Sequence, residues 1–86
     1  MFDEINYKLG KVLFVDNDFK YLREDMLQVE YPDGIILDVG WYGKKKGFII
    51  YVIKNNDWEN PVIESRVSDI GRLKKEIEAT IEYILQ

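Results

Sequence analysis

Carboxylates and aromatic rings are the side chains of this sequence that could take part in chemistry. The 86 residues include 16 Asp and Glu and 12 Lys and Arg, with no histidine and no cysteine. The composition therefore excludes imidazole bases, thiolate nucleophiles, disulfides and zinc sites of the usual N/S type. What remains is the chemistry of paired carboxylates, which can hold a metal ion or act as acid and base, and of aromatic rings, which anchor binding partners.

The positions of these acids match no specific catalytic or metal-binding motif. Asp16-Asn17-Asp18 begins like a calcium loop, but Lys20 stands at the fifth position and no glycine follows at the sixth. Gly40, Gly43 and Gly47 lie in and around a predicted hairpin instead of between a strand and a helix, so they do not form a phosphate loop. We therefore predict a non-catalytic protein with no metal and no cofactor.

A tryptophan between two acids is the best candidate for binding a partner. In Asp57-Trp58-Glu59 the ring could anchor a protein while the carboxylates meet its basic side chains. The alternative is that Trp58 folds back over the edge of the core, and the sequence favours neither reading. Three further acids complete the predicted partner-binding set: Glu30, Asp33 and Asp38. Asp38 lies mid-strand, where exposure is favoured because a buried charge needs a partner.

Four strands are predicted to position these residues. Residues 27–31 alternate apolar and polar side chains, and Pro32-Asp33-Gly34 supplies a turn into a second strand at 35–42. The third and fourth strands are predicted at residues 48–54 and 62–67. In this antiparallel meander, Tyr42 ends the second strand and Trp58 follows the third, so the two rings lie at opposite ends of the strands, which predicts two separate aromatic spots.

A C-terminal helix is predicted to cover one face of the sheet. Its apolar stripe repeats with steps of three and four, and consists of Ile70, Leu73, Ile77, Ile81 and Ile84. Ser68 or Asp69 can cap its first turn. The central strands are apolar on both faces, so a second cover is needed.

For that second cover we predict a short N-terminal helix. Phe2, Ile5, Leu9 and Val12 fit a helical stripe, although Gly10 within it costs about 1 kcal/mol. Self-association through the second face stays open as an alternative. The predicted fold is thus α+β, a single domain over residues 1–86, with a four-stranded antiparallel meander packed on a C-terminal helix and a short N-terminal helix.

Charge and hydropathy restrict the class of partner. The net charge is −4, and residues 1–43 hold nine acids against four bases. Nucleic acid is therefore disfavoured, and a basic protein is the favoured partner. No apolar run is long enough for a membrane span, and Met1-Phe2-Asp3-Glu4 lacks the basic start of a signal peptide. We expect a cytoplasmic location, no membrane contact, and a monomer or a weak homodimer.

Parts of the sequence resemble a known class of small bacterial proteins. They are residues 22–34, Asp38-Val39-Gly40-Trp41-Tyr42 and Asn56-Asp57-Trp58-Glu59-Asn60-Pro61. Together they resemble the cytoplasmic immunity proteins of polymorphic-toxin and contact-dependent inhibition systems. The resemblance lies in small size, acidity, a strand meander and aromatic-acidic loops over roughly residues 20–67. It implies a protein that neutralises a cognate toxin by tight binding, often by masking a basic nuclease surface. The alternatives are a homodimeric structural or regulatory module and a phage-type inhibitor of a host enzyme.

Overall fold

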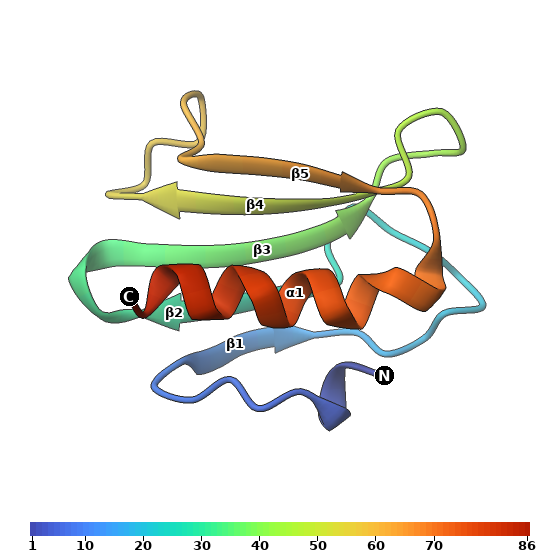
Figure 1. Cartoon of the computed structure of the whole chain (residues 1–86). Helices are drawn as coiled ribbons and strands as arrows, with labels where there is room; N and C mark the ends of the chain where they lie inside the picture. The colour runs from blue at the N-terminus through green and yellow to red at the C-terminus, as the bar shows by residue number, and fades with distance from the viewer.

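Five antiparallel strands form one sheet, in which they lie side by side in the order in which they follow along the chain (Figure 1). The computed structural model describes residues 1–86. The strands are β1 (Lys11–Val15), β2 (Leu27–Tyr31), β3 (Ile35–Trp41), β4 (Phe48–Lys54) and β5 (Ile63–Val67). The predicted α+β class and the meander of β2 to β5 are confirmed, whereas the predicted number of four strands was wrong because β1 was missed.

The turn between β2 and β3 sets the register of the central strands. It is the tight turn η2 (Pro32–Gly34), in which Asp33 and Gly34 have φ angles of 68° and 72°. Glycine adopts this left-handed conformation at little cost, and aspartate tolerates it better than most other residues. The turn places Gln28 directly opposite Asp38.

One α-helix, α1 (Ile70–Ile84), lies in front of the sheet and covers one of its faces (Figure 1). Its buried side chains are Leu73, Ile77, Thr80 and Ile81. They meet alternate side chains of the strands: Leu27, Val29, Tyr31, Leu37, Val39, Phe48, Ile50, Val52 and Val67. Each fully buried aliphatic side chain contributes about 2 kcal/mol, so this layer supplies most of the hydrophobic stabilisation.

The ends of α1 refine the predicted helix. Of the two predicted caps, Asp69 is the one used, since its Oδ1 accepts a hydrogen bond of 2.9 Å from the backbone N–H of Gly71. Ile70 is 49% exposed and so stands outside the core that the predicted stripe assigned to it. With 15 residues and a charged outer face, α1 could not span a membrane, and the chain has no helix longer than α1.

The N-terminal segment differs from the prediction in both structure and position. Only the 3-10 turn η1 (Phe2–Glu4) is helical, and the predicted stripe breaks where β1 begins. Phe2 and Ile5 join the same buried cluster as the helix side chains. The hydroxyl of Tyr31 donates to the carbonyl of Tyr7 at 2.9 Å, and the hydroxyl of Tyr7 donates to the carbonyl of Phe2 at 2.7 Å. The segment therefore closes the helix side of the core and does not cover the second face.

β1 was missed because its sequence lacks the alternation typical of a half-buried strand. Val12, Leu13, Phe14 and Val15 are consecutive apolar residues, and the register with β2 shifts between Val12 and Phe14. Such a bulge lets neighbouring side chains depart from strict alternation. All residues of β1 are exposed, which is characteristic of an edge strand.

Candidate functional site

The face of the sheet opposite α1 carries a hollow of about 400 Å³. Four carboxylates line it: Asp25, Asp38, Glu59 and Glu64. Three aromatic rings line it as well: Tyr42, Tyr51 and Trp58. We refer to this site as the acidic hollow, and its volume is within the range of small-ligand sites.

The floor of the acidic hollow is one row of side chains across four strands. Cross-strand partners in the sheet point to the same face. The row runs through Gln28 on β2, Asp38 on β3, Tyr51 on β4 and Glu64 on β5. The sheet register therefore brings together residues that are up to 36 positions apart in the sequence.

Asp38 is the buried acid of this row. Its exposed fraction is only 4%, and its Oδ2 accepts a hydrogen bond of 2.8 Å from Nε2 of Gln28. Burial raises the pKa of Asp38 above 3.8, the hydrogen bond from Gln28 opposes this rise, and the nearby charge of Asp25 adds to it. The expectation that Asp38 would be exposed was wrong, because Gln28 and the neighbouring rings enclose it.

Two tyrosines form an aromatic wall beside Asp38. The rings of Tyr42 and Tyr51 meet edge to face, with centroids 6.0 Å apart. Burial, followed by the charge of Asp38, raises the pKa of Tyr42 to about 12. Burial and the charge of Glu64 raise the pKa of Tyr51 too. Both hydroxyls therefore stay protonated at neutral pH and can donate hydrogen bonds.

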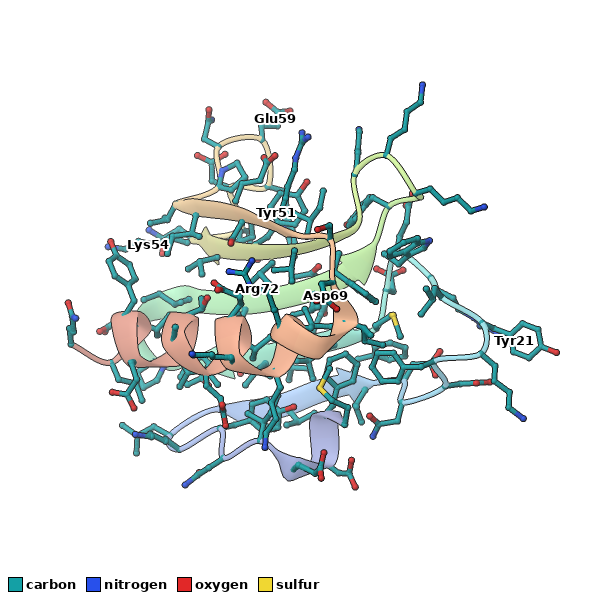
Figure 2. The ribbon with its side chains drawn as sticks, turned by 45° about the vertical axis from the view of Figure 1, so that its right-hand side comes forward. Tyr21, Tyr51, Lys54, Glu59, Asp69 and Arg72 are labelled. Carbon is teal, nitrogen blue, oxygen red and sulfur yellow. The ribbon has the colours of Figure 1, made fainter.

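Trp58 lines the acidic hollow from the loop between β4 and β5. Its side chain is 46% exposed and does not belong to the buried core, so it is not a core plug. Figure 2 shows Glu59 on the same loop, which rises beyond β4 and β5, and Tyr51 on β4 below it. The sequence predicted separate spots for Tyr42 and Trp58, but both line the same hollow from its opposite ends.

The backbone before β2 passes close to β3 and thereby places Asp25 at the acidic hollow. The segment before β2 continues the pairing with β3, because the N–H of Trp41 donates to the carbonyl of Arg23 at 2.7 Å and that of Met26 to the carbonyl of Val39 at 3.1 Å. A Cβ atom on Gly40 would overlap the backbone carbonyl of Glu24. Glycine at position 40 therefore permits the approach that brings Asp25 to the hollow.

No basic side chain lines the acidic hollow. Arg66 on β5 lies beside Glu64: its Nη2 is 3.9 Å from Oε2 of Glu64 in an exposed and long ion pair. Such a pair contributes little and leaves Glu64 free to exchange partners. The hollow is therefore a site of negative potential.

Three of the six predicted binding residues meet in the acidic hollow. They are Asp38, Trp58 and Glu59. The other three do not line it: Asp57 accepts long hydrogen bonds from Asn60, Glu30 is exposed on β2, and Asp33 lies in the turn η2.

Sequence reasoning did not assign Asp25, Gln28, Tyr51 and Glu64 to the site. The one available signal was the alternation within β3 and β4, which puts Asp38 on one face of β3 and Tyr51 among the second-face residues of β4. That these faces coincide depends on the register, which the sequence does not specify.

The acidic hollow combines carboxylates with aromatic rings. No group of three or more acidic side chains is arranged to hold a metal. The carboxylates instead surround aromatic rings, which attract cations by their negative faces.

No family model, curated protein or solved structure matches this chain.

Proposed function

We propose that this chain is a non-catalytic inhibitor of the immunity type, which neutralises a cognate bacterial toxin in the cytoplasm by binding a basic surface of it. The observation that carries the proposal is the acidic hollow, where four carboxylates and three aromatic rings meet without a basic side chain. Aromatic anchors surrounded by complementary charge are typical of tight protein interfaces.

The buried position of Asp38 supports a binding role. A buried carboxylate with one protein partner lowers the stability of the fold, since its charge is removed from water. A basic partner that supplies the missing positive charge recovers this free energy on binding. The exposed acids of the hollow, Glu59 and Glu64, would speed the encounter with a basic surface.

The experiment is co-expression of this chain with a toxin domain encoded beside its gene, with growth as the readout. Wild-type chain should restore growth, and a variant combining Asp38→Asn, Glu59→Gln and Glu64→Gln should not. Glu78→Gln on α1 is a matched control, because it removes an exposed acid far from the acidic hollow. Growth restored equally by the triple variant would contradict the proposal.

Binding kinetics with the purified toxin domain separate the two kinds of side chain. We expect Glu59→Gln to slow association and Trp58→Ala to speed dissociation, since exposed charges act on encounter and buried anchors on residence. Asp57→Asn, which removes the adjacent charge outside the hollow, should have a smaller effect than Glu59→Gln. Association should also slow as salt rises.

A homodimeric module is the second candidate, and β1 is the observation that favours it. Self-pairing through the acidic hollow would bring carboxylates of two copies together, so that route is disfavoured. β1, however, exposes 40% to 47% of each of four consecutive apolar side chains, Val12 to Val15, at a sheet edge. Light scattering tests this candidate: a dimer whose mass falls to that of a monomer with Phe14→Lys would support it, and a monomeric wild type would remove it.

A further inference from the structure

We propose that the acidic hollow receives one arginine side chain of the partner, whose guanidinium group lies against the aromatic rings and bonds to Asp38. This inference rests on the proposed function and names the chemical group that the site recognises. It is carried by the free oxygen of the buried Asp38 side chain and by the arrangement of the aromatic rings beside it.

Asp38 has one oxygen available to a ligand. Its Oδ2 accepts the hydrogen bond from Gln28, whereas its Oδ1 accepts none from the protein. Every fully buried side-chain oxygen and nitrogen of the structure has a partner. Because Oδ1 has no protein partner, it is not one of these fully buried atoms and keeps some exposure, which it has toward the hollow that Asp38 lines. A donor that enters the hollow completes the hydrogen bonds of a carboxylate that is otherwise 96% buried.

The aromatic side chains give the hollow a surface for a flat cation. Tyr42 and Tyr51 stand edge to face beside Asp38, and Trp58 lines the opposite end. A cation over a tyrosine or tryptophan face is stabilised by the ring quadrupole, more strongly where water is excluded. The rings thus add to the attraction of the carboxylates instead of competing with them.

Arginine fits these groups better than lysine. Its guanidinium is planar, stacks on aromatic faces, and carries five donors that can reach several acceptors at once. The acceptors are spread over the row of Asp38 and Glu64 and over Glu59 on the loop above it. A lysine ammonium is a compact, strongly hydrated charge that can satisfy only part of this set.

The test is a nuclear magnetic resonance titration of the full chain with three capped tripeptides, Gly-Arg-Gly, Gly-Lys-Gly and Gly-citrulline-Gly. Citrulline is nearly isosteric with arginine but uncharged. We expect the arginine peptide to bind with a Kd on the order of 1 mM, the lysine peptide more weakly and the citrulline peptide not measurably.

The two tryptophans supply an internal control for the location of binding. The indole N–H signal of Trp58 should shift on titration, whereas that of Trp41, which packs against Phe48 on the helix side of the sheet, should not. Asp38→Asn and Glu64→Gln should each weaken the arginine peptide, by about tenfold for Asp38 because its charge-assisted hydrogen bond is the buried one. Glu78→Gln, which removes an exposed acid of α1 outside the hollow, should leave the affinity unchanged.

Three results would overturn the inference: equal affinity for the arginine and citrulline peptides, shifts confined to residues outside the hollow, or unchanged affinity of a folded Asp38→Asn variant. If these occur while substitutions in the hollow still abolish toxin inhibition, the proposed function stands and the arginine inference alone is wrong. If the arginine peptide binds as expected but the same substitutions do not change toxin inhibition, the arginine inference holds and the proposed function is wrong.

Discussion

Gln28 and Asp38 stand directly opposite each other on β2 and β3, joined by a hydrogen bond of 2.8 Å from the amide nitrogen to the carboxylate. The bond offsets part of the cost of burying the charge, and it fixes the orientation of the carboxylate at the floor of the acidic hollow. The free oxygen then lies where an incoming donor can reach it. The buried charge of Asp38 thus lowers the stability of the fold, while its free oxygen serves the binding of a partner.

Asp38→Asn should stabilise the fold at neutral pH. The folded-state pKa of Asp38 is raised above its ordinary value of 3.8, so the folded state holds the proton more tightly than the unfolded state. The ionised group thus destabilises the fold at pH values above both pKa values, and the penalty fades as pH falls through the folded-state pKa. Thermal melts of both proteins should differ at pH 7, with the variant melting higher, and should converge below pH 3.8. A variant that melts lower at pH 7 would contradict this assignment.

Gly40→Ala should destabilise the fold by about 3 kcal/mol, since the new Cβ overlaps the backbone carbonyl of Glu24 and forces the segment before β2 away from β3. Gly43→Ala is the control: it meets no atom within 4 Å but has a φ of 96°, so only the conformational cost of about 1 kcal/mol applies. Urea titrations of the two variants measure the difference. Equal losses would show that the crossing at Gly40 is not tight.

Ile77→Asp should unfold the protein. Ile77 lies on the sheet-facing side of α1 and is completely buried, and an unpaired buried carboxylate costs several kcal/mol against a total stability of about 5 kcal/mol. Ile70→Asp places the same group on the same helix, but at a half-exposed position in the first turn, where a negative charge is favourable. Circular dichroism should show a lost melting transition for the first variant and a retained one for the second.

Tyr7→Phe should lower the free energy of unfolding by about 1 kcal/mol, because the variant loses the hydrogen bond to the carbonyl of Phe2. Tyr21→Phe removes the same hydroxyl from an exposed ring that projects from the connection between β1 and β2 (Figure 2), and should change the stability little. Denaturant titration distinguishes them. A null result for Tyr7 would mean that the N-terminal segment is not tied down through this bond.

The sequence predicts the central fold well because its local signals are strong. Alternation within β2, the Pro32-Asp33-Gly34 turn and the stripe of α1 are each decided by neighbouring residues. β1 carries no such signal: its run of apolar residues could belong to a strand or a helix, and the bulge between Val12 and Phe14 hides the strand period.

The acidic hollow was less predictable because it depends on relations between strands. The row from Gln28 to Glu64 exists only in the observed register, and a shift of one residue in β3 would turn Asp38 to the other face. Trp58 and Glu59 were predicted as binding residues from their loop composition, but the course of that loop toward Glu64 is a tertiary feature. The burial of Asp38 could therefore not be predicted without knowing both the strand register and the course of this loop.

The strand order, identical to the order along the chain, also has a consequence for how the protein folds. Each strand pairs with its immediate neighbours in sequence, so the sheet can form by successive short loop closures, which favours refolding within milliseconds. The contact between Lys8 and Glu82 joins residues 74 positions apart and closes a loop that spans most of the chain. We expect the N-terminal segment to dock last. Stopped-flow tryptophan fluorescence should then report a single fast phase. Tyr7→Phe should leave the folding rate unchanged and should raise the unfolding rate.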